Sequence, residues 1–222
     1  GNPKFYNLQK KGSVPDLPGT QSEVDALKES LKIKGWHVEV KSQDKAVESE
    51  IKSNLDASVI HLATHGLFEK PVNQHIDLDG LEVDIDNSLF HSGLILAGGG
   101  DLLATGQSYN EKPGILTSYE ALNMRLDAVD LVVLSACETG KGSIHDGEGV
   151  FGLQRSFLVA GANNVIMSLN KVPDDVTSLL MSKFYNNWLN GDDYHEALLN
   201  AKRDIRKDFS DPYYWASFVL IG

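Results

Sequence analysis

Two apolar runs constrain the fold of this chain most strongly. Each run leads to a residue that is capable of acid–base or nucleophilic chemistry. Residues 57–66 lead to His65, and residues 130–140 lead to Cys137. Both runs are rich in aliphatic residues, lack a helical period and are followed by glycine, which is typical of strands buried on both faces of a parallel sheet. Because ligands of open α/β sheets lie outside the carboxyl ends of the strands, we expect His65 and Cys137 to meet over one substrate.

Helical and extended patterns alternate before the first of these runs. Thr20 and Glu23 have the spacing of a capping box, and the apolar stripe that follows predicts a helix ending near Gly35. Residues 36–40 alternate as a strand does, and residues 45–54 carry the pattern of a second helix. This order of elements indicates βα units.

The alternation continues after a long interruption. Residues 67–116 are rich in Gly and Asp, with one apolar run at 94–97, and we expect a long irregular segment of the kind that carries function. A capping box at Thr117 and Glu120 predicts a short helix before the Cys137 strand. The remaining patterns predict helices at 150–160, 174–191 and 193–207 and strands at 164–169 and 217–221. We therefore predict an α/β fold in which a mostly parallel sheet is flanked by helices on both faces.

Composition limits the classes of function. A chain of 222 residues can form one domain with an ample core, and its single cysteine cannot form an internal disulfide. The net charge of −11, with acidic residues gathered at 77–86, argues against nucleic-acid binding. No stretch approaches the roughly 18 to 20 apolar residues that span a bilayer, and no basic-then-apolar leader opens the chain. We expect a soluble, cytoplasmic protein that contacts neither nucleic acid nor membrane directly.

The residues at the two strand ends match the needs of peptide cleavage by a cysteine. Such cleavage needs a nucleophilic sulfur, a group that moves protons and donors for the oxyanion of the tetrahedral intermediate. Cys137 supplies the sulfur, His65 moves the proton, and the backbone N–H groups of Gly66 and Cys137 are the predicted oxyanion donors. The alternative is structural, because a lone cysteine at the end of a buried strand and a histidine on a strand are commonly core residues.

A metal site is not expected. His61 and His65 have the i, i+4 spacing of zinc-binding helices, but their segment contains no Glu and is predicted to be a strand, where that spacing does not bring both rings to one metal. Residues 77–80 resemble the start of a calcium loop, yet the glycine comes too early and no Glu closes the loop.

Several further segments, in this order and spacing, resemble the CHAT peptidase domain, a caspase-like family of cysteine proteases related to separases. The resemblance covers nearly the whole chain, 1–222, and implies a caspase-like three-layer α/β/α fold, a His65–Cys137 dyad and no cofactor. It rests on residues 17–24, His61–Gly66, Leu131–Gly140, Gly147–Leu153, Phe157–Ala162 and Pro212–Phe218.

The chain departs from the family pattern at two places. Members carry Trp where this chain has Asn170, which leaves the pocket wall there in question. The first residues resemble a point inside such a domain, so we expect the chain to be a C-terminal fragment of a longer protein that lacks the start of the domain. The family also implies fusion to a helical-repeat region that recruits the substrate or holds the protease inactive.

Asp174 and Asp175 are candidates for substrate binding. Separase and legumain relatives use an acidic residue some forty positions after the nucleophile to receive a basic side chain, and Asp174 matches that place. The alternative is an acid stabilised by the dipole at a helix N-terminus, and the two neighbours can divide these roles. We predict a cysteine endopeptidase that cleaves proteins, with a preference for a basic residue before the scissile bond. The alternatives are an inactive caspase-like scaffold that binds a partner protein, and an acyl hydrolase that uses the same dyad.

Overall fold

The fold is known from a computed structural model, which describes residues 17–53, 56–68, 74–78, 81–85, 89, 92–100, 114–135, 137–138 and 148–222. The helices within these residues are α1 (Pro18–Ile33), α2 (Glu48–Ser53), α4 (Ser118–Leu122), α5 (Glu148–Val159), α6 (Asp174–Leu189) and α7 (Tyr194–Asp208), with 3-10 turns η2 (Gln43–Lys45) and η4 (Pro212–Tyr214). The strands are β1 (Val59–Leu62), β2 (His65–Phe68), β3 (Gln74–Leu78), β4 (Leu81–Ile85), β5 (Ser92–Ile95), β6 (Ile115–Thr117), β7 (Leu131–Leu134), β8 (Cys137–Glu138), β9 (Asn164–Ser168) and β10 (Phe218–Ile221).

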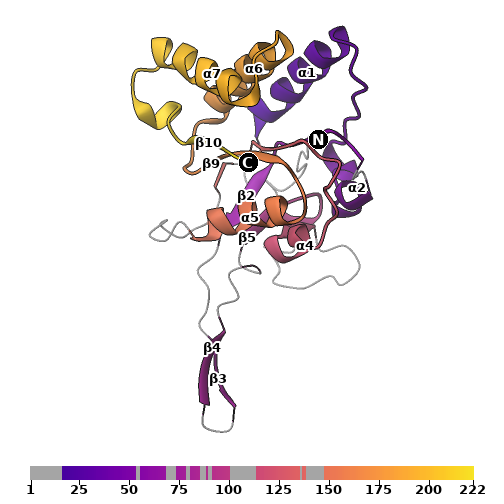
Figure 1. Cartoon of the computed structure of the whole chain (residues 1–222), viewed down its shortest axis with the longest axis vertical. Coiled ribbons are helices and arrows are strands. Elements are labelled where there is room, and N and C mark those ends of the chain that lie inside the picture. The colour runs from indigo at the N-terminus through magenta and orange to yellow at the C-terminus, as the bar shows by residue number, and fades with distance from the viewer. Residues whose placement is uncertain are drawn as a thin grey trace.

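The main sheet has the order β1-β7-β9-β10, and helices cover both of its faces (Figure 1). Strands β1, β7 and β9 are parallel, and β10 pairs antiparallel with β9. Along β7 the side chains alternate between the two faces, as the pleat requires. Leu131 and Val133 pack with residues of α1, α6 and α7, whereas Val132 and Leu134 pack with residues of α4 and α5. This arrangement confirms the predicted α/β fold with a mostly parallel sheet between two helical layers.

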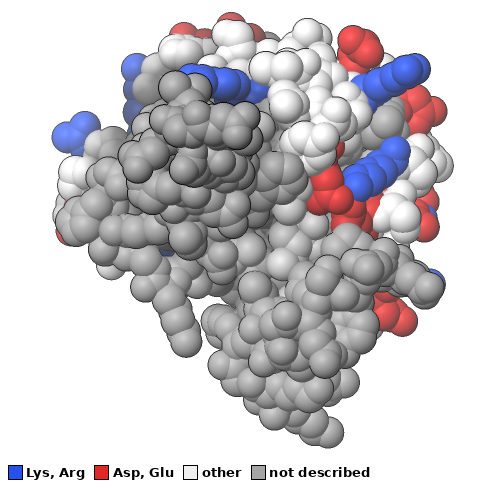
Figure 2. Space-filling view, turned by 90° about the horizontal axis from the view of Figure 1, so that it is seen from below, with Lys and Arg blue, Asp and Glu red and all other residues white. Residues whose placement is uncertain are grey.

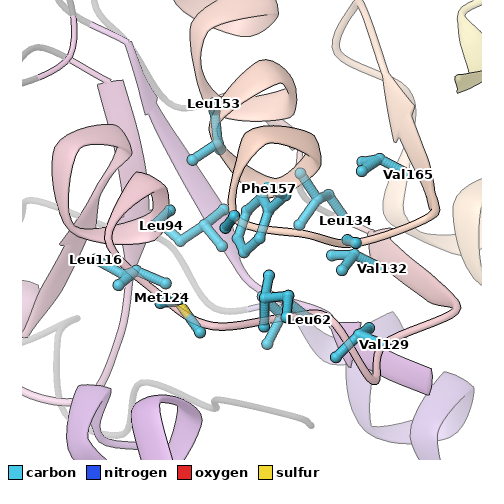
Figure 3. Packing of buried hydrophobic residues seen from close by; sticks show 14 of the residues in the cluster. Leu62, Leu94, Leu116, Met124, Val129, Val132, Leu134, Leu153, Phe157 and Val165 are labelled. Atoms are coloured by element: carbon cyan, nitrogen blue, oxygen red, sulfur yellow. The ribbon is translucent and has the colours of Figure 1, made fainter. Parts of the chain in front are cut away.

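Aliphatic and aromatic side chains fill the layer between the sheet and α5. Phe157 is fully buried and packs within the cluster that includes Val132 and Leu134 (Figure 3). Burial of this apolar area is the main stabilising term, at about 25 cal/mol per Å². The two strands that lead toward the candidate site are therefore anchored by core contacts on both faces.

A second sheet, of order β6-β5-β2-β8, is built where the chain leaves β1 and β7. After Leu62 the chain passes through Ala63 and Thr64 before β2 begins, and the Thr64 hydroxyl donates to the carbonyl of Ile95. The prediction of one unbroken strand up to each of the two site residues is therefore wrong. Each run divides into a strand of the main sheet and a strand of the second sheet, because the second half of each run pairs with new neighbours.

The segment that we expected to be irregular, 67–116, contains ordered pairs of strands. The antiparallel pair β3 and β4 forms a hairpin that extends away from the rest of the molecule (Figure 1). Strand β5 pairs with both β2 and β6. The apolar run at 94–97 therefore contributes to the second sheet, and the expectation of a largely irregular segment is wrong for these residues.

Near the beginning of the described chain, two local predictions are also wrong. Leu17 is the N-cap of α1 and makes no side-chain cap, so Thr20 and Glu23 do not form a capping box. Residues 36–40 are not assigned to a strand; instead the Trp36 ring lies 5.2 Å from that of Trp188. In contrast, the capping box at the start of α4 is confirmed.

Candidate active site

The second sheet brings His65 and Cys137 together as neighbours. Strands β2 and β8 are parallel, and their register pairs His65 with Cys137 and Gly66 with Glu138. Neighbouring strands lie about 4.8 Å apart, so the backbones of the two residues lie next to each other. Neither run predicts this pairing by itself.

His65 lies in the interior of this sheet. Strand β2 is bordered by β8 on one side and by β5 on the other, where the partner of His65 is Ile95. The His65 residue is 1% exposed. His65 is therefore held among packed strands, and its role in proton transfer stays a prediction.

The structure describes the backbone of both predicted oxyanion donors, Gly66 and Cys137. Gly66 is buried in β2, with Leu94 as its partner in β5. The backbone of Cys137 belongs to β8, and its side chain lies outside the described part of the structure. The oxyanion role of the Gly66 and Cys137 N–H groups stays a prediction.

Asp174 lies at the N-terminus of α6 and contacts the N-terminus of α1. One oxygen of its carboxylate accepts a hydrogen bond from the backbone N–H of Gly19, across 155 positions of sequence. Burial raises the pKa of the Asp174 carboxyl, the Gly19 and Thr20 hydrogen bonds oppose this, and the charge of Glu23 adds to it. The carboxylate therefore stabilises the first turn of α1, a structural role that the sequence did not suggest.

Asp175 and Asn170, the other residues in question, have local partners. The exposed Asp175 accepts a hydrogen bond from the N–H of Val176, and the helix dipole favours an acid in the first turn of a helix. The Asn170 side chain donates to the Ser217 hydroxyl at 3.4 Å, and the backbone carbonyl of Asn170 accepts from the Ser168 hydroxyl at 2.6 Å. These contacts leave the predicted substrate-binding roles of Asp174 and Asp175 as predictions.

The sequence did not predict a buried polar cluster at the ends of β1 and β7, formed by Glu23, His61, Ser135 and Tyr185. Glu23 is 1% exposed, and one of its carboxylate oxygens lies 2.9 Å from Nε2 of His61. The other oxygen accepts a hydrogen bond of 3.1 Å from the Ser135 hydroxyl, and Nδ1 of His61 lies 3.1 Å from the Tyr185 hydroxyl. The available signal is an acidic residue within the apolar stripe of an amphipathic helix, although its spacing from Thr20 is also that of a capping box.

Charged side chains of both signs are mixed on the described surface. In Figure 2, Lys and Arg side chains lie beside Asp and Glu side chains on the face that is seen. Within the described part of the chain, no helix combines the length and hydropathy required to cross a membrane.

Comparison with known proteins identifies the family. The CHAT domain profile matches residues 1–222, the whole of the chain. The chain belongs to the CHAT domain family. This confirms the resemblance inferred from the sequence motifs, and the three-layer α/β/α arrangement is consistent with the caspase-like fold of that peptidase family.

Two curated relatives match about half of this CHAT domain. Tetratricopeptide repeat protein 28 of Mus musculus is 37% identical over 110 residues, which are 49% of this chain and 4% of that protein. Tetratricopeptide repeat protein 28 of Homo sapiens is 35% identical over 128 residues, or 55% of this chain and 5% of that protein. The chain thus spans only a small part of the relatives' length, and their names refer to repeats rather than to an enzymatic activity.

Proposed function

We propose that this CHAT domain is a cysteine endopeptidase in which His65 and Cys137 form the catalytic dyad. The observation that carries the proposal is the register of β2 and β8, which makes the two residues neighbours on parallel strands. Membership of a caspase-like peptidase family supports the same reaction class. The burial of His65 favours a fixed ring orientation, which proton transfer requires.

The proposed reaction has two steps. His65 takes the proton from Sγ of Cys137, and the thiolate attacks the carbonyl carbon of the scissile peptide bond. The backbone N–H groups of Gly66 and Cys137 stabilise the oxyanion, after which the C–N bond breaks and His65 gives its proton to the leaving amine. His65 then removes a proton from water, and the hydroxide attacks the acyl carbon of the thioester. The C–S bond breaks, the carboxylic acid leaves, and His65 returns the proton to Sγ of Cys137.

We further propose that Asp174 favours substrates with Arg or Lys before the scissile bond. A carboxylate that is only half-buried can still pair with a substrate cation, and one of its oxygens is already bonded to Gly19. A cation at this site would lower the pKa of the Asp174 carboxyl, which burial raises in the free protein. Asp175 is the second candidate for the same role.

The family comparison also supports a proposal about partners. Because both curated relatives are tetratricopeptide repeat proteins, we place a helical-repeat region in the full-length protein, where it recruits the protein substrate or controls access to the site. The proposed site of action is the cytoplasm.

A fluorogenic peptide library, varied at the residue before the scissile bond, tests the proposal on the full-length protein. We expect cleavage in the wild type and its loss to background in both Cys137→Ala and His65→Ala. Parallel assays with ester substrates distinguish a peptidase from an acyl hydrolase. Persistence of cleavage in Cys137→Ala would refute the dyad, and absence of cleavage in the wild type would favour a partner-binding scaffold.

Asparagine variants test the preference for a basic residue. Asp174→Asn keeps an oxygen that accepts from Gly19 and removes only the charge, so we expect cleavage after Arg and Lys to fall relative to cleavage after neutral residues. Asp175→Asn makes the same change at the second candidate. Glu29→Gln, on the exposed side of α1, controls for a general change of surface charge. An unchanged preference in Asp174→Asn and Asp175→Asn would refute this part of the proposal.

A further inference from the structure

The buried carboxylate of Glu23 requires compensation by specific partners. An ionised carboxylate that leaves water without hydrogen bonds or an opposite charge costs several kcal/mol. Glu23 has both carboxylate oxygens engaged, one near Nε2 of His61 and the other accepting from the Ser135 hydroxyl. Leucine in this position of the apolar stripe would avoid that cost. Packing alone therefore does not explain why Glu23 occupies this position, and its polar contacts indicate another role.

The two partners lie at the ends of the strands that lead to the proposed dyad. His61 is the third residue of β1, four positions before His65, and its register partner is Val133 of β7. Ser135 directly follows β7, two positions before Cys137, and its N–H donates to the carbonyl of Leu62 at 3.0 Å. Both partners thus precede the points where the chain passes from the main sheet into the second sheet.

The helix that carries Glu23 also contacts Asp174. Gly19 and Glu23 are four residues apart, so they lie on the same face of α1, about one turn from each other. Gly19 binds the Asp174 carboxylate, and Glu23 binds the two strand ends. The Tyr185 hydroxyl of α6 contacts Nδ1 of His61 and so helps to orient the ring.

We infer that Glu23 is a positioning residue for the dyad: its carboxylate fixes the ends of β1 and β7 against α1 and so sets the relative positions of His65 and Cys137. This inference rests on the proposed function. Glu23 acts through His61 and Ser135 and does not touch the substrate. Its effect follows from geometry, because a displacement of about 1 Å between reacting groups can reduce a rate by about 100-fold.

The variants Glu23→Gln, Glu23→Leu and Ser135→Ala, made in the full-length protein, separate positioning from charge. Glutamine keeps the shape of the side chain, with an oxygen that accepts from Ser135 and an amide that donates to Nε2 of His61. Leucine keeps most of the volume and removes both polar contacts, the one with His61 and the hydrogen bond from Ser135. Ser135→Ala removes one bond with the smallest structural change, and it serves as the test if Glu23→Leu fails to fold.

Glu48 provides a matched control. It is also a buried carboxylate, 8% exposed, but it pairs with Lys52 of its own helix, α2. Glu48→Gln and Glu48→Leu therefore make the same chemical changes at another buried carboxylate. Thermal unfolding of every variant shows how much of any loss of activity comes from loss of folded protein.

The kinetic readout is the separation of kcat from KM on the peptide that the wild type cleaves best. We expect Glu23→Leu to lower kcat by about 10- to 100-fold with KM within about threefold of the wild type, and Ser135→Ala to lower kcat by about 3- to 10-fold. Glu23→Gln retains kcat within about threefold. A change confined to KM, or an equal fall of kcat in Glu23→Leu and Glu48→Leu, would overturn the positioning role.

A second readout does not depend on peptide cleavage. Iodoacetamide labels Cys137, and mass spectrometry follows this label on the tryptic peptide that spans residues 126–141. We expect slower labelling in His65→Ala and in Glu23→Leu than in the wild type or Glu23→Gln. If the wild type cleaves no peptide but the variants show this pattern of labelling rates, the proposed peptidase activity is refuted and the positioning role of Glu23 is upheld. Equal rates in the wild type, His65→Ala and Glu23→Leu would overturn the positioning role, whatever the peptide assay shows.

Discussion

Replacing Gly19 with alanine tests the contact between α1 and Asp174. Alanine is usually favoured over glycine within a helix by about 0.5 to 1 kcal/mol. Here a Cβ at position 19 would lie 2.5 Å from Oδ2 of Asp174, 2.7 Å from its Cγ and 3.0 Å from its backbone oxygen. The carboxylate must therefore rotate away, and the hydrogen bond from the Gly19 N–H is lost.

The expected cost follows from these terms. A hydrogen bond to a charged group contributes about 1.5 to 3 kcal/mol, from which the helix preference of alanine is subtracted. We therefore expect Gly19→Ala to lower the free energy of unfolding by about 1 to 2 kcal/mol. For a domain of this size, that change corresponds to a fall in Tm of about 2 to 8 °C.

Urea and thermal unfolding measure this difference, and Gly152→Ala is the matched control. Gly152 lies in α5, and a Cβ there would be 3.6 Å from the Ser92 hydroxyl oxygen, an ordinary contact distance. We expect Gly152→Ala to stabilise the protein by up to about 1 kcal/mol. Both variants replace glycine with alanine in a helix. Changes of opposite sign in the free energy of unfolding would therefore point to the contact with Asp174, which only position 19 makes.

A double-mutant cycle tests the cause directly. In an Asp174→Ala background the rotating carboxylate is absent, so Gly19→Ala should cost at least about 1 kcal/mol less than it does in the wild type. The reasoning is refuted if Gly19→Ala is as stable as the wild type. It is also refuted if the cost of Gly19→Ala is the same in both backgrounds.

Three further predictions concern stability and can be checked by unfolding experiments. Thr117→Ala removes the acceptor for the Glu120 N–H at the start of α4 and should cost about 1 kcal/mol in urea unfolding; an unchanged midpoint would contradict the capping role. Phe157→Ala should cost about 3 to 5 kcal/mol, because its ring is fully buried, and a loss below about 1 kcal/mol would mean that the cavity collapses. Burial raises the pKa of the Asp174 carboxyl in the folded protein above its ordinary value of 3.8. The wild type should therefore lose stability relative to Asp174→Asn as the pH rises from 3.8 through the higher folded-state pKa. A stability difference between the two proteins that does not change with pH would contradict this prediction.

Local patterns in the sequence predicted most of the elements of the fold. The apolar run of β7, the capping box of α4 and the amphipathic patterns of α6 and α7 depend on residues within a few positions of one another. Side-chain periodicity and capping are local effects, so the sequence is sufficient to predict them. The family resemblance, carried by several ordered motifs, was confirmed over the whole chain.

Long-range contacts decided the features that local patterns did not predict. Glu23 has the spacing of a capping-box residue, yet His61 and Ser135 compete for its carboxylate once α1 packs on the sheet. Asp174 is bonded to Gly19, a residue 155 positions away. A hydrogen bond between groups so distant in sequence forms only when packing has brought them together, so no local pattern encodes it.

The candidate site shows the same division between sequence and tertiary structure. The sequence by itself determined that His65 and Cys137 each follow a buried β-strand, because aliphatic runs bounded by glycine encode such strands. Only the tertiary structure decided that both runs break before these residues and continue in a second sheet, where β2 and β8 pair in register. The physical reason is that register depends on pairing between strands more than 70 positions apart, and the free energy of that pairing is absent until the sheets assemble.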